Sequence, residues 1–141
     1  MLKVLVFMPV LGAALIAVLP ARRALRLWQV AMLFALATLG YALWLAAGFD
    51  PAGPAIQLHE SRPWNIRLGS YFALGIDGIA LAMVLLSALL SLIAVLVSRR
   101  MEDGARLYFT LVLLLESAMF GVFTARDWSL FYVFWEATLI P

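Results

Sequence analysis

The sequence predicts an all-α, polytopic membrane protein with four transmembrane helices and a truncated fifth, folded as a single membrane domain over residues 1–141. Two observations support this fold class. Hydrophobic residues make up 66% of the chain and charged residues only 13%, whereas soluble domains average about 45–50% and 25%. The apolar residues also form runs close to the ~20 residues that a spanning helix needs. The Lys and Arg residues stand in short clusters between these runs, where they act as topology signals rather than as a nucleic-acid surface.

Residues 2–20 form the first apolar run, which we interpret as a transmembrane helix. The alternative is a secretory signal peptide, because Lys3 provides a short basic region before the apolar stretch. Cleavage would leave Arg22, Arg23 and Arg26 on the translocated side, against the rule that basic residues stay in the cytoplasm. We therefore favour a retained helix followed by a basic turn.

Residues 27–49 form the second spanning run, and residues 50–72 form an extramembrane loop that is rich in proline, glycine and polar side chains. Apolar and polar residues alternate in part of this loop, as at Trp64, Ile66 and Leu68. Alternation of this kind is typical of a strand. A short hairpin is therefore one interpretation of the loop.

Three further helices follow. The third, at residues 77–97, begins at Asp77, whose carboxylate we interpret as a helix cap. The fourth covers residues 107–124. The fifth, at residues 128–141, has fourteen residues, or about 21 Å of a ~30 Å bilayer core. Either the chain is a truncated piece of a longer protein or this helix is re-entrant, and an end in mid-helix at Pro141 favours truncation.

The basic residues predict the topology. The first side of the membrane holds Lys3, Arg62, Arg67 and Arg126. The second side holds Arg22, Arg23, Arg26, Arg99, Arg100 and Arg106. Because the side with more basic residues is usually cytoplasmic, we expect the N-terminus and the loop at residues 50–72 to lie outside the cytoplasm.

Two acidic residues, Glu116 and Glu136, lie inside predicted spanning runs. A charged side chain near the bilayer centre costs roughly 2.5–3.5 kcal/mol on insertion scales, so such residues usually face a protein interior or a water path. Both are candidate proton relays, and Glu136 is the stronger one. The alternative is a protonated acid that only packs against a neighbouring helix. Both residues lie ten positions from Arg126, which predicts equal depth and Cα atoms within about 15 Å of each other.

Other chemistry is excluded by composition. The chain has no cysteine and a single histidine, so disulfides, thiolate metal sites and cysteine-ligated iron–sulfur clusters are excluded. His59 cannot build a metal site alone, and we interpret it as a solvated loop residue. Without a glycine-rich phosphate loop, we expect no cofactor or metal site here.

The motifs that carry these residues resemble one family. They are GIDGIAL at residues 75–81 and LLLESAMFGVFTARDWSLFYVFWEATLIP at residues 113–141. Both are similar to subunit M (chain 4 in mitochondria) of respiratory complex I, an antiporter-like membrane subunit related to Mrp cation/proton antiporters. The resemblance implies that the glutamate of the FWE-x-x-L-I-P pattern, Glu136, is essential for proton pumping. Glu116 matches an acidic position found in many members. The resemblance also implies about fourteen helices, with a membrane lysine that pairs with Glu136 lying beyond Pro141.

The predicted function is therefore that of the N-terminal part of a proton-translocating membrane subunit of NADH-quinone oxidoreductase. The resemblance implies NADH, FMN, iron–sulfur clusters and quinone on partner subunits. It also implies other membrane subunits of complex I as partners and a multi-pass location in the cell inner (plasma) membrane, within the lipid bilayer. Two alternatives stay open, namely an Mrp-type antiporter subunit and a non-pumping structural membrane fragment. The sequence leaves proton against sodium transport and the quinone type undecided.

Overall fold

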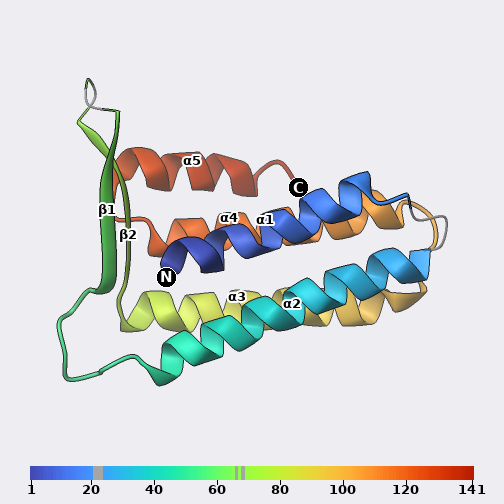
Figure 1. Ribbon diagram of the computed structural model, residues 1–141, viewed down its shortest axis with the longest axis horizontal. Coiled ribbons are helices and arrows are strands. Elements are labelled where there is room, and N and C mark those ends of the chain that lie inside the picture. Colours follow the sequence, from blue (N-terminus) through green and yellow to red (C-terminus); the bar gives the residue numbers. More distant parts are fainter. Residues whose placement is uncertain (21–23, 66, 68) are drawn as a thin grey trace.

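The computed structural model describes residues 1–20, 24–65, 67 and 69–141. Four long helices run side by side, a shorter fifth helix lies beside them, and a two-stranded sheet stands across one end of the bundle (Figure 1). The elements in chain order are α1 (Leu2–Val18), α2 (Ala24–Ala47), β1 (Gln57–Asn65), β2 (Ser70–Ile76), α3 (Gly78–Val97), a 3-10 turn (Ser98–Arg100), α4 (Ala105–Thr124) and α5 (Trp128–Thr138).

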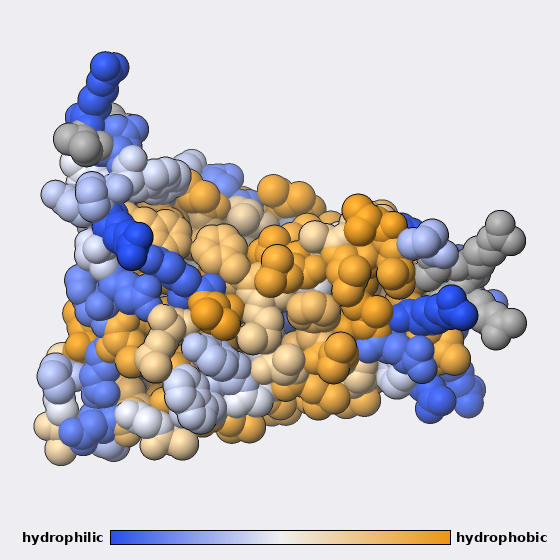
Figure 2. Space-filling model, in the orientation of Figure 1, coloured by the Kyte–Doolittle hydropathy of each residue, from blue (hydrophilic) through white to orange (hydrophobic). Residues whose placement is uncertain are grey.

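The surface of the bundle fits a membrane. On the face shown in Figure 2, hydrophobic side chains dominate the middle and hydrophilic ones gather at the two ends. Among the described residues, three segments are long and apolar enough to span a bilayer: α2, the segment Gly78–Arg100 that begins with α3, and α4. Helix α1 contains Pro9 and has 17 residues. Its length is therefore about 25 Å at 1.5 Å per residue. The first predicted transmembrane helix is thus present as a shorter apolar helix, and its spanning is not confirmed.

The all-α prediction is wrong in one respect, because the chain also contains a β-hairpin. β1 and β2 pair antiparallel, with Glu60 opposite Leu74 and Arg62 opposite Phe72. The partial alternation in the predicted loop did indicate this hairpin, although Ile66 and Leu68, which supported it, lie outside the described residues. The sheet forms because β2 buries Leu74 and other apolar side chains against the ends of the helices, while β1 covers its outer edge.

Aspartate side chains cap the starts of α3 and α5. The Asp77 cap is confirmed, since its Oδ1 accepts a hydrogen bond from the Ala80 N–H at 2.8 Å. Asp127 caps α5 in the same manner, by accepting from the backbone N–H groups of Ser129 and Leu130 at 3.0 and 3.2 Å. The Asp127 cap was not predicted, although an aspartate directly before an apolar run is the usual signal for one.

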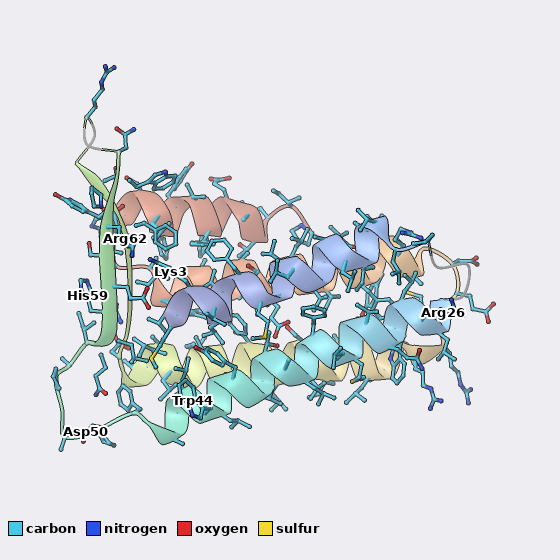
Figure 3. All side chains as sticks on the ribbon, viewed as in Figure 1. Lys3, Arg26, Trp44, Asp50, His59 and Arg62 are labelled. Atoms are coloured by element: carbon cyan, nitrogen blue, oxygen red, sulfur yellow. The ribbon has the colours of Figure 1, made fainter. Side chains whose placement is uncertain are left out.

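The two ends of the bundle separate the basic residues as the topology prediction requires. One end carries the N-terminus, the hairpin and the α4–α5 turn, and the other carries the α1–α2 and α3–α4 connections (Figure 1). Lys3 and Arg62 lie at the first end and Arg26 at the second (Figure 3). Arg22 and Arg23 lie outside the described residues. Which end faces the cytoplasm stays a prediction.

Helix α4 occupies the centre of the bundle, where it packs against α1, α2, α3 and α5. Two clusters of buried apolar side chains surround it. The cluster near the hairpin includes Leu5, Leu74 and Phe120, and the cluster at the opposite end includes Ile16 and Phe109. Glu116 lies on α4 between Phe109 and Phe120 in sequence, and therefore between the two clusters in space.

Candidate functional site

Glu116 is fully buried inside the bundle. Its side chain has a relative exposure of 0%, as does Thr38 of α2, which faces it. The Thr38 hydroxyl lies 2.8 Å from Glu116 Oε1, and Oε2 has no hydrogen-bond partner among the described residues. None of the ion pairs in the described part of the chain includes Glu116. A buried carboxyl without a cation is unusual in a structural role, because burying an unpaired charge is costly.

The neighbouring residue fixes α4 to a second helix. The Ser117 hydroxyl donates a hydrogen bond of 2.6 Å to the carbonyl oxygen of Val6 in α1. Adjacent residues of α4 therefore make polar contacts to α2 through Glu116 and to α1 through Ser117. These two contacts fix the position of the Glu116 carboxyl relative to α1 and α2.

Glu136 lies in a different environment, on the exposed side of α5. The Phe134 ring faces α4, where a Cβ on Gly121 would lie only 2.2 Å from it. Two residues correspond to roughly 200° around a helix, so Glu136 points away from α4. The phenol of Tyr132, one turn earlier, interacts with its carboxylate. The structure therefore does not bring the Glu116 and Glu136 carboxyls into one groove.

The depths of the two acids are nevertheless similar. Helices α4 and α5 are antiparallel neighbours (Figure 1), and the close contact between Gly121 and Phe134 sets their register. Glu116 is five residues before Gly121, and Glu136 is two residues after Phe134. The difference of three residues is about 4.5 Å along the axis at 1.5 Å per residue. The prediction was equal depth, and the bound of about 15 Å between the Cα atoms stays a prediction.

A groove of about 230 Å³ lies between α1, α4 and α5. Its walls are mainly apolar and include Phe7, Leu114 and Phe134, with Ser117 as a polar group. Ala137, which follows Glu136, also lines it. The groove reaches the Ser117 side of α4, whereas the Glu116 carboxyl turns toward α2.

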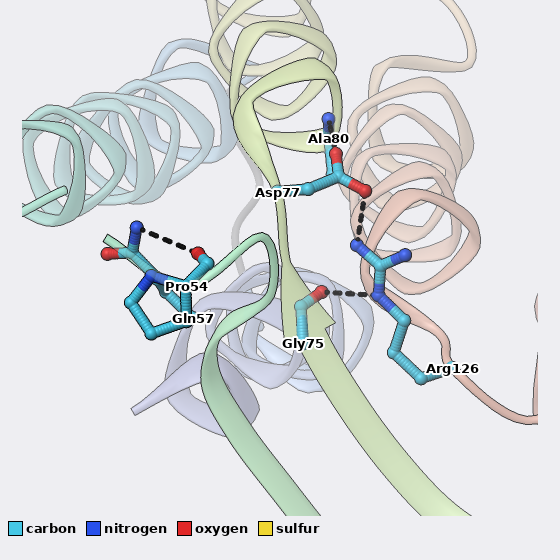
Figure 4. Close-up of polar contacts among 6 residues, drawn as sticks. All are labelled: Pro54, Gln57, Gly75, Asp77, Ala80 and Arg126. Carbon is cyan, nitrogen blue, oxygen red and sulfur yellow. Dashed lines mark hydrogen bonds and ion pairs between the residues drawn. The ribbon is translucent and has the colours of Figure 1, made fainter. Parts of the chain in front are cut away.

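A network of hydrogen bonds and one ion pair, centred on Arg126, joins the sheet, α3 and the α4–α5 turn. Arg126 Nη2 lies 2.7 Å from Asp77 Oδ2, and Arg126 Nε donates to the Gly75 carbonyl at 3.4 Å (Figure 4). The Arg126 backbone N–H donates to Ala73 at 2.8 Å. The Ala80 backbone N–H and then the Arg126 guanidinium lower the pKa of the Asp77 carboxyl. The sequence predicted the cap but not this ion pair, whose partners are 49 residues apart.

The start of α5 is tied to the hairpin as well. The Tyr71 backbone N–H donates to Asp127 Oδ2 at 3.2 Å, and the Ser70 and Ser129 hydroxyls are 2.9 Å apart. His59 is exposed on β1 (Figure 3), as expected for a solvated residue. The hairpin thus positions the helix that carries Glu136.

Comparison with curated proteins finds relatives among subunit M and chain 4 proteins, although no family model matches the chain. NADH-quinone oxidoreductase subunit M of Rhodobacter capsulatus is 38% identical over 146 residues, covering 100% of this chain and 28% of that protein. F(420)H(2) dehydrogenase subunit M of Methanosarcina mazei is 37% identical over 75% of this chain and 22% of the relative. NAD(P)H-quinone oxidoreductase chain 4 of a Synechococcus species is 35% identical over 99% of this chain and 26% of that relative. The chain spans about a quarter of the length of these relatives.

Solved structures agree with this assignment. Respiratory complex I from Thermus thermophilus with bound NADH contains a chain that matches with a TM-score of 0.81 and 33% identity, over 100% of this chain and 27% of that one. The membrane-bound sulfane sulfur reductase, an archaeal respiratory membrane complex, matches with a TM-score of 0.79 at 20% identity, over 96% and 21%. At 20% identity the second match shows the fold alone. The resemblance to the antiporter-like subunits, inferred from the motifs, is confirmed.

Proposed function

We propose that this chain, a homologue of the subunit M and chain 4 proteins of quinone oxidoreductases, is part of a proton-translocating membrane subunit of an NADH:quinone oxidoreductase. One observation carries the proposal. Glu116 is fully buried at the centre of an apolar bundle, without a cation and with one carboxyl oxygen unpartnered among the described residues. Such a carboxyl costs stability in lipid and is usually retained for function.

In this proposal the electron-transfer cofactors belong to partner subunits. The relatives are named for different donors, which are NADH, NAD(P)H and F(420)H(2). Similar membrane subunits in complexes with different donors support a role separate from the redox chemistry. NADH, FMN, iron–sulfur clusters and quinone would then act on other subunits and drive proton movement through this one.

Glu136 is the proposed primary relay. It lies on the face of α5 that points away from α4 and is exposed in this chain, so a cation on another segment or subunit can approach it. A nearby cation favours the carboxylate, whereas its withdrawal favours the neutral acid. Movement of a positive charge near Glu136 would thus release or take up a proton.

Glu116 is the proposed second relay. The two carboxyls lie within about one helical turn of depth but face different directions. We therefore treat them as separate proton sites rather than as a directly hydrogen-bonded pair.

The test uses the full-length parent protein assembled in its complex. We expect Glu136→Gln to abolish proton pumping and much of the coupled electron transfer, because glutamine keeps the shape but cannot exchange a proton. Glu136→Asp should retain part of both. Glu102→Gln, at an exposed acid in the α3–α4 connection, is the matched control and should pump normally.

Normal assembly of Glu136→Gln with pumping at the wild-type rate would show that Glu136 is structural. If Glu116→Gln also pumps normally, the non-pumping structural role becomes the better account. Cation/proton exchange in vesicles that lack NADH-driven pumping would instead indicate an Mrp-type antiporter subunit.

A further inference from the structure

We infer that Thr38 of α2 is a positioning residue for Glu116. The Thr38 hydroxyl donates a hydrogen bond to the Glu116 carboxylate and accepts one from the neutral Glu116 acid. The inference rests on the proposed role of Glu116 as a proton site. The inference adds Thr38 to this site, although Thr38 lies on another helix and 78 positions away in sequence. The same Thr38–Glu116 contact can then stabilise both the ionised and the neutral carboxyl.

Three oxygen atoms compete for the single proton of the Thr38 hydroxyl. Oγ1 lies 2.8 Å from Glu116 Oε1 and 3.0 Å from each of the carbonyl oxygens of Phe34 and Ala35. All three distances are within hydrogen-bond range. A hydroxyl has one donor and two acceptor lone pairs, so it can donate to only one of these oxygens at a time.

The protonation state of Glu116 decides which oxygen receives that proton. An ionised carboxylate only accepts, so Thr38 must then donate to Oε1. A neutral carboxyl can donate its own O–H to Thr38, and the threonine proton then turns toward the carbonyl of Phe34 or Ala35. Thr38 keeps its proton throughout, the gained proton stays on Glu116, and the change needs only rotation of the hydroxyl.

Another buried threonine shows what is particular to Thr38. Thr124 of α4 is equally buried, and its hydroxyl donates to the Phe120 carbonyl of its own helix at 2.7 Å. That is the ordinary contact of a threonine within a helix. No acid is recorded near the Thr124 hydroxyl among the described hydrogen bonds. Thr124 therefore provides a matched control for replacement of a buried threonine.

Thr38 is also the one hydrogen-bond partner recorded for the Glu116 carboxyl in the described part of the chain, because Oε2 has none there. In a helix, threonine populates mainly two χ1 rotamers because its hydroxyl can bond carbonyl oxygens of the preceding turn, and Thr38 Oγ1 lies within reach of two such oxygens as well as of Glu116. Removing this hydroxyl should change the Glu116 carboxyl itself, whereas removing the Thr124 hydroxyl should not.

The experiment measures the infrared carboxylic C=O stretch of Glu116 in the full-length protein within its complex, together with proton pumping. The band is identified by its loss in Glu116→Gln. We expect Thr38→Val to move the band to the higher frequency of an acid without a hydrogen bond and to lower pumping about tenfold, the scale of one lost hydrogen bond to a charged group. Thr38→Ser should restore the wild-type band and most of the pumping. Thr124→Val should leave both unchanged.

A wild-type band position in Thr38→Val would overturn the inference, as would a Thr38→Ser variant that behaves like Thr38→Val. If Thr38→Val does not assemble, Thr38→Ala also lacks the hydroxyl and must shift the band in the same direction. The two proposals fail differently. Normal pumping in Glu116→Gln refutes the relay role of Glu116, whereas an unshifted band refutes only the contact with Thr38.

Discussion

Gly121 is a point of close contact between α4 and α5, and its replacement by alanine tests the packing that orients Glu136. A Cβ built on Gly121 lies 2.2 Å from two carbon atoms of the Phe134 ring and 2.5 Å from a third. Non-bonded carbon atoms prefer about 3.5–4.0 Å, so the overlap is at least about 1.3 Å. Either the Phe134 ring must rotate away or α5 must move outward.

The expected loss of stability is the balance of two terms. Overpacking of this kind costs about 1–3 kcal/mol, while replacing glycine by alanine inside a helix gains about 1 kcal/mol. Gly121→Ala should therefore lower the free energy of unfolding by about 1 kcal/mol. Gly40 in α2 is the matched control, because nothing lies within 4 Å of its added Cβ. Gly40→Ala should be neutral or stabilising by up to about 1 kcal/mol.

The assay is denaturant unfolding of the full-length protein in detergent, with Phe134→Leu completing a double-mutant cycle. Leucine is narrower than the ring, so Gly121→Ala should cost less in the Phe134→Leu background, with a coupling of about 1 kcal/mol. Equal stabilities of Gly121→Ala and Gly40→Ala, or additive effects in the cycle, would refute the close packing and the orientation of α5 derived from it.

Three further outcomes are expected. The backbone N–H groups at the start of α3 and the Arg126 guanidinium lower the pKa of Asp77 below its ordinary value of 3.8. A lowered folded-state pKa contributes stability that is complete above the unfolded-state pKa and is lost as pH falls through the folded-state value. The stability advantage of the wild type over Asp77→Asn, measured by thermal unfolding, should thus be constant near neutral pH and shrink below about pH 4. The amino terminus is the main group that lowers the pKa of Glu60, so Glu60→Gln should increase hydrogen exchange at the start of α1. This increase should be smaller in high salt, because the amino group and the Glu60 carboxylate are partly exposed and salt screens their attraction. An impermeant maleimide should label Ala52→Cys from outside the cell and Glu102→Cys only after permeabilisation, and the reverse pattern would invert the topology.

The sequence predicted the elements better than their contacts. Hydropathy identified the apolar runs, and basic residues grouped the connections at the two ends of the bundle. The rotation of each helix could not be predicted, because lipid-facing side chains are as apolar as core ones and leave no polar face to mark the outside. For that reason nothing in the sequence paired Thr38 with Glu116 across 78 residues.

Local chemistry was predictable where the signal lies within a few residues. The Asp77 cap follows from an aspartate at a helix boundary, whereas its ion pair with Arg126 depends on how the hairpin folds back over the bundle. Equal spacing from Arg126 predicts the depth of Glu116 and Glu136 but not the direction in which each carboxyl points, which depends on helix rotation. The contact of the Phe134 ring with Gly121 turns Glu136 outward. The signal in the sequence that could have indicated this rotation is the small Gly121 on one helix and the large Phe134 on the next.

The most direct test of the central claim, that carboxyl groups inside the spanning helices carry protons, is the number of protons translocated per NADH oxidised by the assembled complex in proteoliposomes. We predict that the ratio falls close to zero when Glu116→Gln and Glu136→Gln are combined, at equal assembly. An unchanged ratio in the double variant would contradict the account.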